Sequence, residues 1–268
     1  MKKKTLVAVA IILSLGVSII SGCTKKDNAK EEKGKEKKYL VLGLDDTFVP
    51  MGFKDDKGEI TGFDVDLAKE VGKRIGKEIK FQSIDWSMKE TELNSKNIDL
   101  IWNGYTITEE RREKVSFSKP YLENRQVIIT LSNSSINKKE DLKGKKISAQ
   151  SGSSSVDAMN KEPDLVKTFN SGKPVLFETN NEALMDLEAG RVDAVVADEI
   201  LARYYMKQRG ESKYKVLTED FGKEEYGIGI RKDDKELLEK VNKALEDMKE
   251  DGTSKTISEK WFGEDIVK

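Results

Sequence analysis

Short apolar runs alternate with helical patterns from residue 39 onward. The apolar runs predict strands, and apolar residues that recur on one helical face predict the helices between them. In the first half, the pattern predicts a strand at 39–44, a helix at 64–76 with Asp64 as its N-cap, a strand at 79–84, a helix that ends at Leu93 and a strand at 98–102. This strand and helix order predicts an α/β sheet.

The second half repeats the same order. It predicts strands at 126–131, 146–150 and 194–197, helices from residue 156, over 182–189 and after 197, an amphipathic helix at 233–248 and a last helix that ends near 261–263. Two sets of strands and helices in one chain predict two α/β lobes.

The first residues predict export. Three lysines follow Met1, and residues 6–20 are apolar, which is typical of a secretory signal. The run ends in Ile20-Ser21-Gly22-Cys23, which resembles the bacterial lipobox, where the signal is cut before a cysteine that receives a lipid. The alternative, an uncleaved anchor, is disfavoured because the run is shorter than the roughly 20 apolar residues that span a bilayer. We therefore predict a signal peptide at 1–22, followed by a lipidated Cys23 and a flexible tether over residues 23–38.

Composition excludes several kinds of chemistry. Cys23 is the only cysteine and the chain has no histidine. An intrachain disulfide, thiol catalysis and histidine-based catalysis are therefore excluded, and we expect neither a metal nor a cofactor. The 48 basic and 49 acidic residues nearly balance, which argues against a nucleic acid partner.

Seven segments together resemble the polar amino acid family of bacterial solute-binding proteins, the extracellular receptors of ATP-driven importers. They are residues 48–55, 62–67, 103–111, 117–121, 141–145, 151–152 and 226–228. The resemblance extends from about residue 39 to 263. It implies an α/β, two-lobed periplasmic-binding-protein fold with two crossover hinge strands and the ligand in the interlobe cleft.

The same resemblance implies the lobe boundaries. By spacing, the crossovers fall near 121–125 and 222–226. Lobe 1 is then residues 39–122 and 225–268, and lobe 2 is residues 123–224. Closure of the two lobes would bury the ligand.

The backbone groups of an amino acid need an anion site and a cation site. Thr108 is a good N-cap, which places Arg111 in the first helical turn, and the family uses the arginine of this motif to bind the ligand carboxylate. The alternative is that Arg111 pairs with Glu109 or Glu110 on the surface. Across the cleft, the turn 151–155 precedes a helix and offers free N–H groups, with Ser153 and Ser154 as the expected contacts.

The cation site falls at Asp198. This residue follows the predicted strand 194–197, and the family's ammonium-binding aspartate has this position. The alternative is a helix N-cap. Asn103, Gly104 and Thr106 are expected to complete the contacts around the α-carbon.

Recognition of the ligand side chain is assigned to Asp45, Phe48, Trp86 and Gln150, with Tyr105 as a further candidate. Asp46 is an equal rival of Asp45. Gln150 and Ala197 replace a lysine and a histidine of the best-known glutamine receptors, which leaves the ligand open. The lost lysine argues against glutamate and aspartate. Glutamine and cystine are favoured, and a cationic amino acid remains possible.

These expectations define a lipid-anchored, monomeric receptor that binds a polar amino acid. We expect it on the outer face of the cytoplasmic membrane of a Gram-positive bacterium, attached through the lipid on Cys23, with a permease and its ATPase as partners. The alternative is an enzyme on the same fold, such as a lyase similar to cyclohexadienyl dehydratases. A third functional class is a sensor lobe that reports the bound ligand to a partner protein.

Overall fold

The computed structural model describes residues 37–268. The predicted signal peptide, Cys23 and all but the last two residues of the predicted tether therefore lie outside the described residues. Within residues 37–268, none of the helices is both long enough and apolar enough to cross a membrane.

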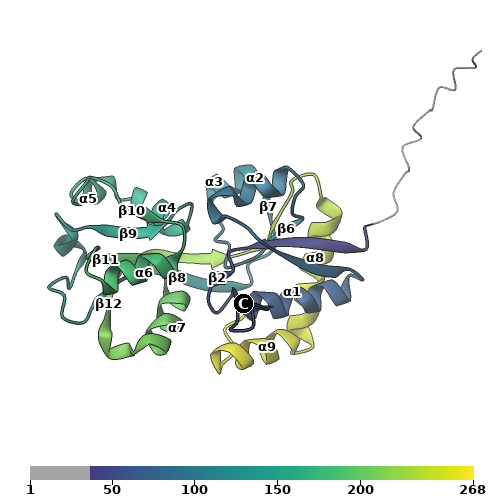
Figure 1. Cartoon of the computed structure of the whole chain (residues 1–268). Coiled ribbons are helices and arrows are strands. Elements are labelled where there is room, and N and C mark those ends of the chain that lie inside the picture. The colour runs from purple at the N-terminus through teal and green to yellow at the C-terminus, as the bar shows by residue number, and fades with distance from the viewer. Residues whose placement is uncertain (1–36) are drawn as a thin grey trace, which may run out of the picture. The chain divides into compact units, whose positions relative to one another are not determined.

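Lobe 1 contains a mixed sheet in which β1 lies beside β5 and β6 in parallel, and β13 runs antiparallel to β6 and β7 (Figure 1). Its strands are β1 (Tyr39–Leu44), β5 (Glu78–Ser83), β6 (Leu100–Ile101), β7 (Ser116–Phe117) and β13 (Gly229–Ile230). Its helices are α1 (Phe63–Arg74), η1 (Trp86–Met88), α2 (Lys89–Asn94), α3 (Glu109–Lys114), α8 (Lys235–Glu250) and α9 (Thr253–Phe262). A small antiparallel sheet adds β2 (Thr47–Phe48), β3 (Gly52–Lys54) and β4 (Ile60–Thr61).

Lobe 2 contains a second mixed sheet, in the order β10-β9-β11-β8-β12. Its strands are β8 (Leu122–Leu131), β9 (Ile147–Gln150), β10 (Val175–Phe177), β11 (Ala194–Asp198) and β12 (Tyr214–Tyr226). Its helices are η2 (Lys139–Leu142), α4 (Ser154–Asn160), α5 (Pro163–Val166), α6 (Asn180–Glu188), α7 (Glu199–Arg209) and η3 (Glu211–Lys213).

Two long strands connect the sheets. β8 carries the chain from lobe 1 into lobe 2 and β12 brings it back, and they pair antiparallel between the lobes, for example Asn124 with Glu224. Both strands are seen between the two halves in Figure 1. The C-terminal helices α8 and α9 then pack against α1 in lobe 1.

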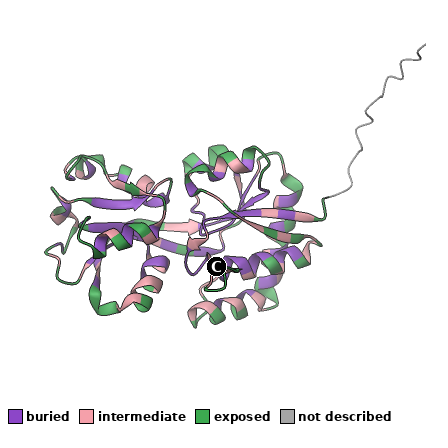
Figure 2. Ribbon diagram, in the orientation of Figure 1, coloured by how far each residue is buried: buried purple, intermediate pink, exposed green. Residues whose placement is uncertain are grey.

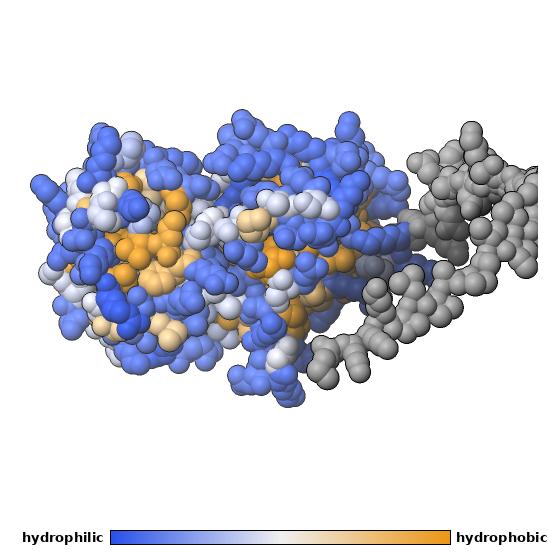
Figure 3. All heavy atoms as spheres, turned by 45° about the horizontal axis from the view of Figure 1, so that its top comes forward, coloured by the Kyte–Doolittle hydropathy of each residue, from blue (hydrophilic) through white to orange (hydrophobic). Residues whose placement is uncertain are grey.

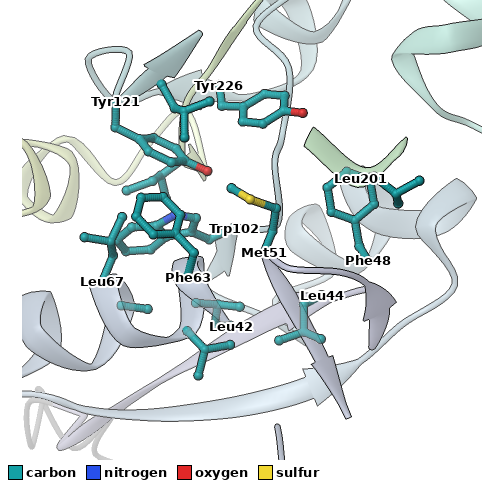
Figure 4. Packing of buried hydrophobic residues seen from close by; sticks show 14 of the residues in the cluster. Leu42, Leu44, Phe48, Met51, Phe63, Leu67, Trp102, Tyr121, Leu201 and Tyr226 are labelled. Atoms are coloured by element: carbon teal, nitrogen blue, oxygen red, sulfur yellow. The ribbon is translucent and has the colours of Figure 1, made fainter. Parts of the chain in front are cut away.

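Apolar side chains fill the interior of both lobes. Figure 2 shows that much of the strands is buried. One cluster runs from lobe 1 into lobe 2, because Phe48 on β2 lies close to Leu201 on α7 (Figure 4). A second cluster lies within lobe 2 around Ile128, Ile147 and Val196. Hydrophilic residues cover most of the face seen in Figure 3.

The sequence predicted most elements to within a few residues, and one cap was wrong. Asp64 does not cap α1, because the helix begins at Phe63 and Gly62 takes the N-cap position. The Asp64 side chain is instead buried at 1% exposure and accepts hydrogen bonds from the Gly104 N–H and the Tyr121 hydroxyl. Glycine suits position 62, because a Cβ there would lie 2.3 Å from the Met51 carbonyl oxygen.

Candidate ligand-binding site

The residues predicted to bind the ligand are all buried, and they come from both lobes. Lobe 1 contributes Asp45, Phe48, Trp86, Asn103, Gly104, Thr106 and Arg111, and lobe 2 contributes Gln150, Ser153, Ser154 and Asp198. Burial of so many polar groups at one interface requires that they be hydrogen-bonded.

Arg111 is turned inward from the first turn of α3. Thr108 caps this helix, and its hydroxyl accepts from the Arg111 N–H at 3.1 Å. The Arg111 guanidinium donates to the Thr106 carbonyl at 3.0 Å and, across the lobes, to the Gly152 carbonyl at 3.2 Å. It also lies 3.5 Å from the Asp157 carboxylate on α4. The rival pairing with Glu109 or Glu110 is absent among the described ion pairs, in which Glu110 pairs with Lys114.

The serine turn of lobe 2 faces this arginine. Ser153 is the N-cap residue of α4, but its hydroxyl and its N–H both donate to the Gln150 carbonyl. The Ser153 N–H is therefore not free, contrary to prediction, because the turn closes on itself. Ser154 contacts the other lobe directly, since the Thr106 hydroxyl donates to the Ser154 hydroxyl at 3.0 Å.

Asp198 lies at the carboxyl end of β11 and is 4% exposed. Its side chain makes no cap bond to α7 and instead accepts from the Gln126 amide at 2.8 Å and the Tyr226 hydroxyl at 2.7 Å. Burial, together with the nearby Glu224 carboxylate, raises the pKa of Asp198 well above its usual value.

Sequence reasoning missed the groups around Asp198. Asn124 and Gln126 on β8 and Glu224 on β12 meet there, and both amides donate to Asp198 and to Glu224. None of them belongs to a segment that resembled the family. Their position on the two crossover strands, at the predicted hinge, is the signal that could have drawn attention to them.

A hydrogen-bonded chain connects the two charged groups. Thr106, which binds Arg111 through its carbonyl, donates through its hydroxyl to Ser154. The Gln126 amide nitrogen lies 3.1 Å from the Ser154 hydroxyl and 2.8 Å from Asp198, and it shares its two hydrogens among Ser154, Asp198 and Glu224. A buried cation and a buried carboxylate therefore lie at two ends of one short polar path between the lobes.

Asp45 and Asp46 point in different directions. Asp45 is 6% exposed and accepts from the Thr47 hydroxyl at 2.7 Å and from the Gln150 amide of lobe 2 at 2.7 Å. Burial raises the pKa of Asp45. Asp46 is half-buried and pairs with Lys54, whose nearby charge and hydrogen bond lower the pKa of Asp46. Of the two, Asp45 lies at the lobe interface.

Gln150 ties three segments together. Besides Asp45, its amide donates to the Glu178 carbonyl at 3.0 Å and accepts from the Asn180 amide at 2.9 Å. The amide is therefore saturated by protein groups in this arrangement.

Aromatic side chains line the site. The Trp86 and Tyr105 rings meet edge to face, with centroids 5.8 Å apart. Tyr105 is fully buried, stacks on Phe117 and lies 4.9 Å beneath the Arg111 guanidinium, so it supports the arginine. Phe48 packs on Gly104, where a Cβ would come within 2.8 Å of its ring and where φ is +59°.

The contacts of Asn103 and Gly104 differ in part from prediction. The Asn103 side chain accepts from the Asp45 N–H at 3.0 Å, which links two predicted site residues. The Gly104 N–H donates to Asp64 at 2.7 Å and is therefore already used within lobe 1. Burial raises the pKa of Asp64 to about 7.

Two hollows open at the lobe interface. One of about 430 Å³ is lined by Thr106, Gln126, Ser154 and Glu224, among others. The other, about 210 Å³, lies beside Trp86 and is lined by four acidic residues, Asp45, Asp46, Asp85 and Glu178. Within residues 37–268, no group of three or more His, Cys, Asp or Glu side chains is arranged to hold a metal ion.

Comparison with known proteins identifies the family. Residues 40–264 match the bacterial extracellular solute-binding proteins, family 3. The L-cystine-binding protein TcyJ of Escherichia coli is 33% identical, over 97% of each chain. A substrate-binding protein of an ABC uptake transporter from Streptococcus pneumoniae, solved with histidine, is 42% identical with a TM-score of 0.84, over 86% of this chain and 94% of that one. An ancestral arginine-binding protein bound to arginine is 45% identical with a TM-score of 0.79, over 85% of this chain and 99% of that one.

These findings confirm the predicted two-lobed α/β fold and the resemblance to polar amino acid receptors. The relatives are binding proteins and not enzymes, which confirms the prediction of a binding protein over the lyase. From the match over residues 40–264 and these relatives, the chain belongs to family 3 of the bacterial extracellular solute-binding proteins.

Proposed function

We propose that this chain is the receptor of an amino acid ABC importer and that it binds a polar amino acid between its lobes. The observation that carries this proposal is the buried Arg111 guanidinium and the buried Asp198 carboxyl group, joined through Thr106, Ser154 and Gln126. Arg111 binds the α-carboxylate and Asp198 binds the α-ammonium group. Without these partners, each charged group of the ligand would lose its water on burial without compensation. Asn103, Gly104 and Ser153 are the proposed contacts around these groups, where the ligand would replace the hydrogen bonds that the Gly104 N–H and the Ser153 hydroxyl make within the protein.

The proposed ligand is L-cystine or glutamine, and L-cystine is favoured. Cystine carries a second ammonium group and a second carboxylate at its far end. The ammonium group would face the hollow beside Trp86, which Asp45, Asp46, Asp85 and Glu178 surround, and the carboxylate would point away from these acids. Phe48 and Trp86 would cover the apolar stem, and Gln150 would turn from Asp45 toward the ligand. The cystine-binding relative that matches 97% of this chain supports this choice.

A cationic amino acid is the second candidate. The same four carboxylates would attract a guanidinium, an ammonium or an imidazolium group. The histidine-bound and arginine-bound relatives support this class. Affinity for arginine above that for cystine would select it.

We further propose that lobe 1 (residues 39–122 and 225–268) and lobe 2 (residues 123–224) move about the crossover strands when the ligand binds. The protein acts as a monomer that delivers its ligand to a permease with an ATPase. Signal cleavage after residue 22 and lipid on Cys23 anchor it to the outer face of the cytoplasmic membrane in a Gram-positive bacterium. Mass spectrometry of the cell-bound protein tests the anchor, since Cys23→Ala should release it without lipid.

Thermal unfolding tests the proposed function. The protein is heated with each of the twenty amino acids, cystine and ornithine in turn. A ligand at 1,000 times its Kd adds about 4 kcal/mol to the unfolding free energy, which is roughly 8 to 16 °C in Tm for a chain of this size. One large shift identifies the ligand. A folded, ligand-free sample with no shift from any amino acid would overturn the proposal.

A further inference from the structure

Two carboxyl groups meet at the ammonium end of the site, although only one was expected there. Asp198 lies on β11 of lobe 2, and Glu224 lies on the crossover strand β12. The Gln126 amide donates to Asp198 at 2.8 Å and to Glu224 at 2.7 Å, so the two acceptors are neighbours. The Asn124 amide bridges the same two oxygens.

The amide of Gln126 is fixed in this orientation. Its oxygen accepts from the Ser155 hydroxyl at 2.5 Å, which directs its nitrogen at the two carboxyl groups. Asn124 and Gln126 are two residues apart on β8 and therefore share one face of the strand. The pair is thus held by two strands and one helix.

The neighbouring charges do not compensate the pair. Arg125 lies between the two amides on β8 and faces the other way, where it pairs with Glu199 on α7 and Asp220 on β12. The Tyr226 hydroxyl donates to Asp198 but brings no positive charge, and Tyr121 packs behind it. Lys161, Lys223 and the acids Glu109, Glu110 and Asp157 line the same hollow as Glu224, but no described ion pair joins either lysine to the two carboxyl groups. Two adjacent carboxylates that no cation contacts repel each other in a buried site.

We propose that Asp198 and Glu224 form one carboxyl pair that holds a shared proton in the empty site, and that the ammonium group of the ligand displaces this proton. This inference rests on the proposed function. The ammonium enters with its charge, both carboxylates become ionised, and one proton passes to solvent. Burial beside Glu224 raises the pKa of Asp198, which agrees with a proton on the pair.

The structure also provides an exit for the proton. Glu224 lines the hollow of about 430 Å³ at the lobe interface, together with Thr106 and Ser154 of the proposed site. Glu224 therefore connects buried Asp198 with a space that opens to solvent. Because Glu224 lies on a crossover strand, its contacts with Asp198 also join the hinge to the ligand site.

Calorimetry tests the proton release. Cystine, glutamine and arginine are titrated into the full chain at pH 7 in buffers of different ionisation enthalpy, and a ligand that binds should release close to one proton. Glu224→Gln should still bind at pH 8, with affinity about threefold to tenfold weaker, and should release almost none. As the pH falls below the range in which the pair titrates, the wild-type Kd should rise by up to tenfold per pH unit, because binding must release a proton. The Kd of Glu224→Gln should change little over the same pH range.

Infrared spectroscopy of the empty protein is the second measurement and needs no ligand. At pH 7, the infrared band of protonated carboxyl groups in the wild-type protein should contain one component from the pair. Both Asp198→Asn and Glu224→Gln should lose this component. Glu225→Gln is the matched control, since Glu225 is adjacent on β12 but pairs with Lys268 at the surface, and it should leave the band unchanged.

The outcomes separate the two proposals. No binding by the wild-type chain would overturn the proposed function, while the infrared result would still decide on the pair. Binding without proton release, or a carboxyl band that Glu224→Gln leaves intact, would overturn the carboxyl pair alone.

Discussion

The two ends of the interlobe site differ in how far the protein satisfies its own polar groups. At the end that we assign to the α-carboxylate and ammonium, a continuous chain of hydrogen bonds joins Arg111 to Asp198 through both lobes. At the other end, four acidic residues surround a hollow, and only Asp45 is buried and bonded across the interface, through Gln150. We propose that the first end binds the groups that every amino acid shares and that the second end accepts different side chains.

This difference explains which residues the sequence revealed. Arg111 stands in a segment that resembles the family, and Asp198 follows the predicted strand 194–197 at the position of the family's ammonium-binding aspartate, so the resemblance pointed to both. Asp45 and Asp46 are adjacent acids at the end of one strand, and only the fold shows that Asp45 faces lobe 2 while Asp46 pairs with Lys54.

The fold was predictable for a related reason. β11 is buried on both faces and β1 is buried on both faces over Leu42–Leu44, and both strands appear in the sequence as continuous apolar runs. Contacts between residues distant in sequence were not predictable. Glu224 accepts a hydrogen bond from Gln126 on β8, and Asp64 accepts from Gly104 and Tyr121, and no local sequence pattern indicates these contacts.

The largest expected effect on affinity is at the end that we assign to the α-carboxylate and ammonium groups. Arg111→Ala should weaken binding of every amino acid by about 1,000-fold, roughly 4 kcal/mol, because a buried carboxylate would lose its charged partner. Calorimetry measures the affinity, and Arg112→Ala, half-exposed on the same helix, is the matched control. Near-normal affinity of Arg111→Ala would show that the carboxylate binds elsewhere.

Asp64, which accepts a hydrogen bond from the Gly104 N–H, should make the unfolding free energy depend on pH. Burial raises the pKa of Asp64 to about 7 from a usual value of 3.8. Its contribution to stability is therefore fully present below pH 3.8 and is lost as the pH rises through about 7, up to about 4 kcal/mol. Asp64→Asn should remove this loss, so its stability relative to wild type should be higher at pH 8 than at pH 4.5.

Denaturant unfolding at both pH values measures this change. The control is Asp66→Asn in the same helix, whose carboxylate pairs with Lys260 at the surface. Parallel stability profiles for Asp64→Asn and wild type would refute the effect.

At the side-chain end, Asp45→Ala should change which amino acid is preferred. We expect about a tenfold loss for cystine and for cationic ligands, the size of one charged hydrogen bond, and a smaller loss for glutamine. Competition binding across these ligands gives the ranking. Asp46→Ala should change the ranking less, because the Asp46 carboxylate is already paired with Lys54, and an equal effect of both substitutions would remove the distinction between the two acids.

The smallest effect is expected at the direct contact between the lobes. Thr106→Val keeps the shape of the side chain but loses the hydroxyl that donates to Ser154. Affinity should fall about threefold to tenfold, mainly through faster dissociation, since one neutral hydrogen bond of the closed form is lost. Stopped-flow kinetics measures both rates, and a change confined to the association rate would argue against this view.

A crystal structure of the protein with the amino acid that gives the largest thermal shift tests the central claim most directly. The account predicts the α-carboxylate on the Arg111 guanidinium and the α-ammonium at Asp198, with the ligand side chain directed toward Asp45 and Trp86. A ligand bound with its carboxylate away from Arg111, or at a place outside the interlobe site, would contradict it.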